Sequence, residues 1–185
     1  MEPTEQLSYI LPQLSATVDR IQTMQMNDPT PCSEFTVHGV LNHMMDGGET
    51  FTSGFRGEEA PEPKPSGVYG WVPAVEFRAV MDGLLEAVKS PGAMERVMTT
   101  PMGVMPGETF ARLVAFDGLM HGWDLASSTG QRFEVPPAVI CAADEFARNA
   151  LTSEMRDGDT FKDATTAPDD ASQLERLVAF SGRSL

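Results

Sequence analysis

ETFARLVAFDGLMHGWDLASS, residues 108–128, carries the clearest structural signal in the chain. Its apolar residues recur every three or four positions, the period of a helix that buries one face in a core. At about 100° per residue, Asp117, His121 and Asp124 all fall within about 40° of Phe110, in the middle of that apolar face. A buried carboxylate is costly unless it is paired or binds a metal, so this helix predicts a polar site inside a helical bundle.

Two earlier segments show the same helical period. Apolar residues predict a first helix from Leu7 to Ile21, in which Pro12 should introduce a kink or mark a late start. A second helix should start at Thr36, a good N-cap residue, and continue to Phe55. Both helices are long enough to pack along the helix at 108–128.

The remaining predicted elements are shorter. In chain order they are a helix over 71–89, a hairpin through Val97–Met105, a helix from Pro136 past Ala150, and a helix over 171–180 capped by Asp169 or Asp170. The segments 56–70 and 157–170 are rich in Gly and Pro or in acidic residues and predict loops. Together these elements indicate an all-α fold, a four-helix bundle with additional short C-terminal helices.

Composition narrows the class of protein. The length of 185 residues predicts a single domain over 1–185. A formal net charge of −14 argues against binding to nucleic acids or anionic membranes. The acidic N-terminus resembles no secretion signal, and no run approaches the roughly 18 apolar residues of a membrane span, so we expect a cytoplasmic protein.

The two cysteines, Cys32 and Cys141, are too few for a disulfide framework. Cys32 comes just before a predicted helix start, where the pKa of a thiol can be lowered. A cysteine without a role in chemistry is the simpler interpretation.

Among the three histidines, helical phase separates His43 from His38. His43 lies about 60° from Val40, at the edge of the apolar face of the second helix, whereas His38 points away from that face. Asp and Glu make up 27 of the 185 residues, so each helical histidine has roughly even odds of an acidic neighbour three or four positions away by chance. Spacing alone therefore defines no site, and the orientation of His43 and His121 towards the interior is the stronger indication.

His43, Asp117 and His121 together make a set of two imidazoles and one carboxylate. Three protein ligands leave a coordination position open, as in catalytic zinc sites, and the same set suits nickel or ferrous iron. Two simpler interpretations stay open, namely a structural Asp117–His121 ion pair and a hydrogen-bonded core histidine. We expect Asp124 to pair with a neighbour or to orient a ligand from outside the site.

Three segments carry recognisable motifs: PTPCSEFTVHGVLNHMMDGGETF (29–51), FDGLMHGWDLASSTGQ (116–131) and DDASQLERLVAFSGR (169–183). Their combination resembles the DinB-like superfamily, in particular the actinobacterial group similar to the N-terminal domain of mycothiol-dependent maleylpyruvate isomerase. The resemblance implies a four-helix bundle that holds a divalent metal, which we expect to be zinc, through His43, Asp117 and His121.

The resemblance also implies a co-substrate, a small thiol of the mycothiol type. In this hypothesis the thiolate takes the open metal position and attacks a small electrophile, so the protein would be a metal-dependent thiol transferase or isomerase. The alternative is a metal- or ligand-binding bundle without catalytic activity. The sequence is compatible with a homodimer.

Three features depart from the isomerase pattern. Asp117 stands where the isomerase has the longer Glu, Phe35 replaces the usual Trp, and we expect no counterpart of the isomerase's second domain in these 185 residues. The resemblance therefore does not carry over the isomerase activity itself. If the substrate is anionic, Arg112 or Arg183 is a candidate to contact it.

Overall fold

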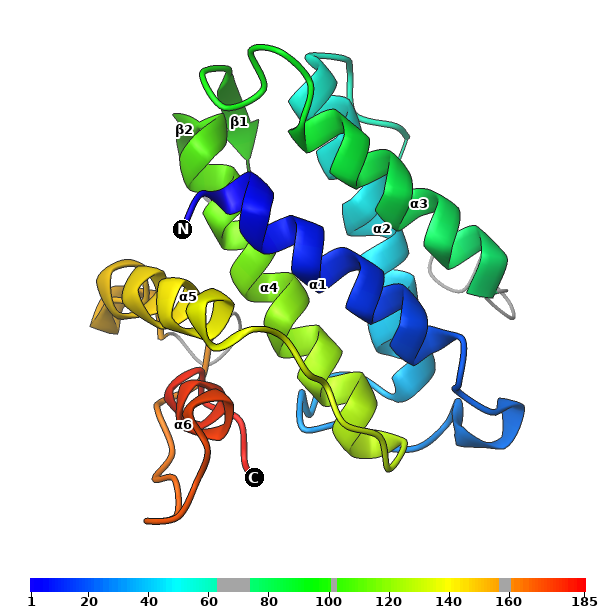
Figure 1. The fold of residues 1–185 in the computed structure, drawn as a ribbon, viewed down its shortest axis with the longest axis vertical. Coiled ribbons are helices and arrows are strands. Elements are labelled where there is room, and N and C mark those ends of the chain that lie inside the picture. The colour runs from blue at the N-terminus through cyan, green and yellow to red at the C-terminus, as the bar shows by residue number, and fades with distance from the viewer. Residues whose placement is uncertain (63–73, 101–102, 157–160) are drawn as a thin grey trace.

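Four helices surround one core in the computed structural model, which describes residues 1–62, 74–100, 103–156 and 161–185. They are α1 (Pro3–Val18), α2 (Val37–Arg56), α3 (Ala74–Val88) and α4 (Gly107–Ser128). α1 packs against α3 and α4, and α2 packs against the same two helices, so the four close into a ring. α1 and α4 run in one direction and α2 and α3 in the other (Figure 1). The predicted all-α four-helix bundle is confirmed.

The other elements of the described residues lie outside this ring. They are η1 (Thr23–Gln25), β1 (Val97–Thr100), β2 (Gly103–Pro106), α5 (Pro137–Ala150), η2 (Ser153–Met155) and α6 (Gln173–Phe180). β1 and β2 form the predicted hairpin, an antiparallel pair with Val97 opposite Pro106. α5 packs on α4, and α6 packs on α5, so both C-terminal helices lie on the outer side of α4 (Figure 1).

The ends of α2 and α4 follow from local sequence. Thr36 caps α2, because its side-chain oxygen accepts a hydrogen bond from the Gly39 amide at 3.2 Å. Gly57 ends the helix with a φ of 74°, a left-handed conformation that costs glycine little. α4 ends at Ser128, before Gly130, as the sequence predicts.

Two predictions for α1 need correction. The helix starts at Pro3 and continues through Pro12, so Pro12 does not mark its start. It also ends at Val18, three residues earlier than predicted. The Ile21 amide then bonds to the Val18 carbonyl across a tight turn, which keeps Ile21 packed on the core although the helix has ended.

The predicted cap of α6 was also wrong. Ser172, not Asp169 or Asp170, caps this helix, and it forms a reciprocal pair with Glu175. The Glu175 amide donates to the Ser172 hydroxyl, and the Ser172 amide donates to the Glu175 carboxylate. Residues 71–73 of the predicted third helix, and most of the predicted loop at 56–70, lie outside the described residues.

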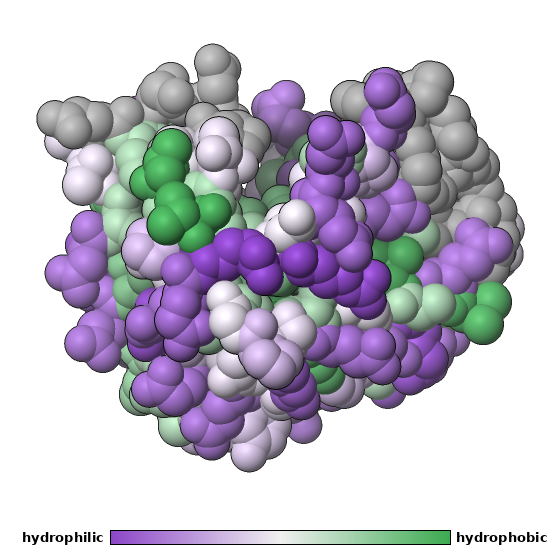
Figure 2. All heavy atoms as spheres, turned by 90° about the horizontal axis from the view of Figure 1, so that it is seen from above, coloured by the Kyte–Doolittle hydropathy of each residue, from purple (hydrophilic) through white to green (hydrophobic). Residues whose placement is uncertain are grey.

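α4 is the central element of the molecule. Buried residues occupy most of its circumference, because the ring covers one side and α5 covers another. The face seen in Figure 2 is mostly hydrophilic, with apolar side chains in small groups. Among the described residues, no helix is both long and apolar enough to cross a bilayer.

Candidate functional site

His121 stands between two carboxylates of its own helix. Its Nε2 lies 3.4 Å from Oδ1 of Asp117, one turn earlier, and its Nδ1 lies 3.0 Å from Oδ2 of Asp124, one turn later. Only 6% of the His121 side chain is exposed. The spacing i, i+4 and i, i+3 on one helix therefore gives each ring nitrogen its own carboxylate.

The Nε2 side of His121 is open to solvent. The His43 ring, contributed by α2, has its centroid 5.0 Å from that of His121, and the residue is exposed. The Asp117 side chain is 39% exposed. One ligand atom from each of His43, Asp117 and His121 lies within 4.8 Å of the others.

This spacing is close to that of a shared ion. Ligands of one zinc ion, each about 2.0–2.2 Å from the metal, lie up to about 4 Å apart. The three donor atoms, within 4.8 Å of one another, are therefore at most about 0.8 Å further apart than two ligands of one ion. The sequence predicts Asp117 in the middle of the apolar face of its helix, but the Asp117 side chain is partly exposed. His43, predicted at the edge of an apolar face, is exposed.

A narrow slot opens beside His43 and Asp117. Its inner volume is about 20 Å³. The remaining lining is mostly apolar and comes from all four helices of the ring: Leu11, Met44, Gly47, Gly48, Phe51, Met81, Leu84, Val114 and Gly118. Met44, Met45, Met81 and Met120 are all buried, and of these four Met44 and Met81 line the slot.

The loop before α2 supplies an aromatic cover. Phe35 stacks on His43 with ring centroids 5.3 Å apart, and its edge meets His121 at 6.3 Å. The loop is fixed by Thr30, whose hydroxyl lies 2.9 Å from the Cys32 carbonyl and 2.8 Å from the Phe35 carbonyl. Phe35 therefore takes a defined place over the two imidazoles.

The Nδ1 side of His121 is closed. Asp124 is 0% exposed, and Arg183 from the C-terminal segment donates to both of its oxygens, Nε to Oδ1 and Nη2 to Oδ2, at 2.8 Å each. Burial raises the pKa of Asp124, but the hydrogen bonds from His121 and Arg183 outweigh it and lower that pKa. Asp124 is thus paired with Arg183 and His121, and its role in orienting a metal ligand stays a prediction. Because both oxygens of Asp124 hold the Arg183 guanidinium, Arg183 is not free to meet an anionic substrate.

Cys32 lies on this closed side. Its sulfur, a ring nitrogen of His121 and a carboxylate oxygen of Asp124 lie within 4.8 Å of one another. Burial is the largest influence and raises the pKa of the Cys32 thiol, against the lowering by Arg183, so the lowered pKa considered from the sequence is wrong. Cys32, Lys162 and Arg183 all line a small hollow of about 60 Å³.

On the open side, Asp117, His121 and His43 shift one another's pKa values. Burial lowers the pKa of His121, but Asp117 and the hydrogen bonds to both carboxylates outweigh it and raise that pKa to about 9. Burial raises the pKa of Asp117, and the charge and hydrogen bond of His121 outweigh it and lower that pKa to about 2. Desolvation and the neighbouring His121 lower the pKa of His43, although Asp117 opposes them. Without metal, Asp117 and His121 thus form an ion pair.

Two residues considered from the sequence lie away from this site. His38 is half-buried, with Nε2 3.4 Å from Nδ2 of Asn42, and belongs to neither cluster of metal-ligand groups in the described residues. Arg112 bonds to Glu108 at 2.8 Å and to the Met1 carbonyl at 3.3 Å.

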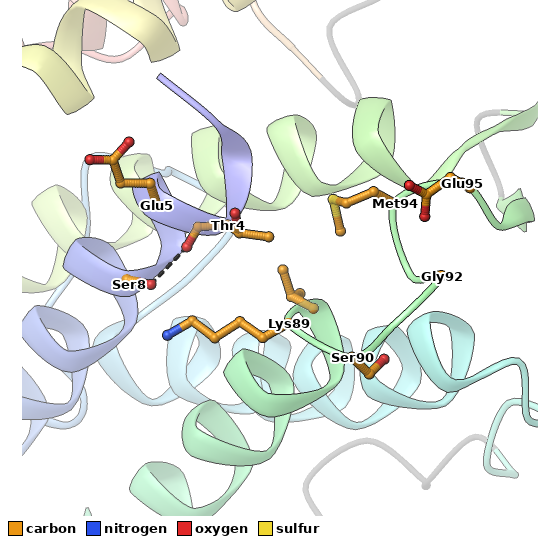
Figure 3. Close-up of a pocket in the computed structure, with 9 residues that line it drawn as sticks. Thr4, Glu5, Ser8, Lys89, Ser90, Gly92, Met94 and Glu95 are labelled. Carbon is orange, nitrogen blue, oxygen red and sulfur yellow. Dashed lines mark hydrogen bonds between the residues drawn. The ribbon is translucent and has the colours of Figure 1, made fainter.

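A larger hollow of about 500 Å³ lies where α1 begins and α3 ends. Figure 3 shows that Ser8 turns back to the Thr4 carbonyl, while Lys89 and Glu95 extend along its rim. The hollow includes Met94, whose carbonyl accepts a hydrogen bond from the Glu108 amide at the start of α4. His121 lies about 21 Å further along that helix, at about 1.5 Å per residue. Neither described cluster of metal-ligand groups touches the hollow.

Comparisons with known proteins agree with this architecture. A family model described as the mycothiol maleylpyruvate isomerase N-terminal domain matches residues 9–126. Two proteins of Mycobacterium tuberculosis, both described as uncharacterized, are each 30% identical over 172 residues, which is 92% of this chain and 92% of theirs. They are MT0763 of strain CDC 1551 / Oshkosh and Rv0738 of strain ATCC 25618 / H37Rv.

A solved structure is similar in fold. It is the crystal structure of a histidine-to-alanine mutant of the mycothiol-dependent maleylpyruvate isomerase, with a TM-score of 0.53 and 14% identity over 78% of this chain and 68% of that one. At this identity the likeness speaks for the fold alone. With the family match and the two mycobacterial relatives, the chain belongs to the family of the mycothiol maleylpyruvate isomerase N-terminal domain.

Proposed function

We propose that this protein binds a divalent metal ion, zinc in the first instance, through His43, Asp117 and His121. With this ion bound, the protein would act as a thiol transferase or isomerase, in which a thiol of the mycothiol type attacks a small electrophile. The observation that carries the proposal is the convergence of these three groups from two helices, with donor atoms within 4.8 Å. Family membership supports a thiol as the partner molecule.

The donor set fits such an ion. Two imidazole nitrogens and one carboxylate oxygen are common zinc ligands, and nickel or ferrous iron accept the same set. Because His43 is exposed and Asp117 is partly exposed, a small molecule can reach the position between them. A divalent ion held there would lower the pKa of a bound thiol and keep it as the nucleophilic thiolate.

The chain's own residues would then orient and enclose the reactants. Asp124 accepts from Nδ1 of His121 and leaves Nε2 directed to the open side. Phe35 covers the two imidazoles and limits the access of water. The slot beside His43 offers apolar contacts to part of an electrophile.

One observation favours a second candidate, a metal-binding bundle without catalytic activity. The slot has an inner volume of only about 20 Å³, so an electrophile could enter only if Met44, Phe51 or Met81 moved. This candidate predicts stoichiometric metal without turnover.

The test combines metal loading with thiol binding. The protein is purified without chelator and loaded with zinc without oxygen. Binding of mycothiol is measured by calorimetry, and thioether products from a panel of small electrophiles are detected by mass spectrometry. We expect thiol binding that depends on zinc and is lost in His121→Ala but kept in His38→Ala. Zinc binding without thiol binding would favour the second candidate, and absence of zinc binding would contradict both.

A further inference from the structure

We infer that Arg183 is a positioning residue for the metal ligand His121, acting through Asp124. This inference rests on the proposed function and extends the site to the C-terminal segment, beyond the residues 9–126 that the family model matches. In this arrangement the guanidinium of Arg183 holds the carboxylate of Asp124, and Asp124 in turn holds the ring of His121. The C-terminal segment therefore also supports the site.

The contacts between the three side chains form a continuous chain. Arg183 donates to both oxygens of Asp124 at 2.8 Å, and Oδ2 of Asp124 also lies 3.0 Å from Nδ1 of His121. A third nitrogen of Arg183 lies 3.1 Å from the Ser181 hydroxyl. Two parallel bonds from one guanidinium define the plane of a carboxylate, which a single bond does not.

The backbone directs Arg183 towards α4. Gly182 has a φ of 95°, and a Cβ there would lie 2.7 Å from the Lys162 carbonyl oxygen. The Thr165 hydroxyl donates to the Arg183 carbonyl at 2.6 Å. The turn is therefore held on both sides of Gly182, and a residue with a side chain at this position would disturb it.

Because Asp124 is buried, its carboxylate depends on the hydrogen bonds from Arg183. Asp124 is 0% exposed and the Arg183 side chain is 11% exposed, so water offers the carboxylate no replacement for the two bonds. Without Arg183, Asp124 would be free to rotate or to bond elsewhere, and Nδ1 of His121 would lose a fixed acceptor. The ring would then no longer be held with Nε2 towards His43 and Asp117.

A double-mutant cycle tests whether Arg183 acts through Asp124. The variants are Arg183→Gln, Asp124→Asn and the combination of both, with Arg183→Lys as a conservative replacement. Arg176→Gln is the matched control, because Arg176 lies in the same segment and bonds to the backbone carbonyls of Ala171 and Asp169 rather than to Asp124. Zinc affinity is measured by competition with a chelator, and ligand geometry by the visible absorption of the cobalt-substituted protein.

We expect Arg183→Gln to weaken zinc binding by about 10–100-fold, the usual cost of losing a partner that orients a metal ligand. It should also shift the cobalt absorption, whereas Arg176→Gln should leave both unchanged. Arg183→Lys should recover part of the affinity through one bond. In the Asp124→Asn background, Arg183→Gln should cost no further affinity.

The metal-free protein provides a second readout. A slowly exchanging ring proton on Nδ1 of His121 should be visible by NMR in the wild type and in Arg176→Gln, and should be lost in Arg183→Gln. This readout decides the inference even if the wild type binds no zinc, in which case the proposed function alone fails. If Arg183→Gln does not fold, the charge-neutral double variant and Arg183→Lys take its place in both measurements.

Two results would overturn the inference. One is a folded Arg183→Gln that keeps both wild-type zinc affinity and the protected ring proton. The other is a loss of affinity that persists in full when Asp124 is already Asn, because Arg183 would then act on the site by another route.

Discussion

The two sides of the His121 ring differ in almost every physical respect. On the Nδ1 side, Asp124 is fully buried and has a bidentate partner in Arg183. On the Nε2 side, Asp117 is partly exposed, lies 3.4 Å from the ring, and faces the exposed His43. Two aspartates seven residues apart on one helix thus have different tasks. Asp124 is held in place by the chain, whereas Asp117 remains able to accept a cation.

The largest expected difference between the two sides is in stability. Asp124→Ala would leave Arg183 buried without its carboxylate, which typically costs about 3–5 kcal/mol. Asp117→Ala removes a group that reaches solvent and should cost about 1 kcal/mol or less. Urea unfolding of the metal-free variants at neutral pH measures both, and equal losses would mean that the two sides are not energetically distinct.

The open side should also make zinc binding depend on pH. The pKa of His121 is about 9 without metal, because Asp117 and Asp124 outweigh the effect of burial. Zinc must displace that proton, so between pH 6 and 8 the affinity should rise about tenfold per pH unit. Chelator competition across this range, with proton release from calorimetry in two buffers, checks the slope. A flat profile would show that His121 is not a ligand.

The closed side depends on the turn at Gly182. Gly182→Ala must accommodate both a left-handed φ and a close carbonyl, which should cost about 1–3 kcal/mol and weaken zinc binding through Arg183. Gly130→Ala, with a φ of 68° and open space around it, should cost only the backbone term of about 1 kcal/mol and leave zinc binding unchanged. Thermal unfolding and zinc titration of both variants sharpen the comparison. Identical losses of stability and zinc affinity in the two variants would show that the turn at Gly182 does not support the site.

The smallest expected effect concerns the aromatic cover of the open side. Phe35→Leu removes the stacking on His43, an interaction of about 0.5–1.5 kcal/mol, and should weaken zinc binding by less than about tenfold. Phe146→Leu in α5, also partly buried, is the control and should leave zinc affinity unaltered. A loss of zinc binding as large as that of a ligand variant would assign Phe35 more than a covering role.

Helical periodicity explains why the bundle could be predicted. The apolar spacing of α1, α2 and α4, and the Thr36 cap, are local features that survive in the fold. The cap of α6 was missed because Ser172 competes with two adjacent acids for the same function, and only the backbone conformation decides between them. Local sequence also left open whether Pro12 would lie inside α1 or mark its start, and in the structure it lies inside the helix.

Helical periodicity could indicate only those residues of the candidate site that lie on long helices. Helical phase selected His43, Asp117 and His121 because all three lie on long helices, α2 and α4, whose apolar residues recur with the helical period. It did not show that α4 is buried around most of its circumference. Cys32 and Arg183 lie in a loop and near the end of the chain, and their proximity to His121 depends on how these segments fold back. The sequence offers Arg183 only as a cation for an anionic substrate, and Gly182 just before it is a local signal of the turn that precedes Arg183.

Zinc titration of the purified protein and its ligand variants tests the central claim most directly. We expect one ion per chain in the wild type, a loss of about 100-fold or more in affinity for each of His43→Ala, Asp117→Ala and His121→Ala, and wild-type affinity in His38→Ala. A wild type that binds no stoichiometric ion, or a His121→Ala variant that binds zinc as well as the wild type, would contradict the account.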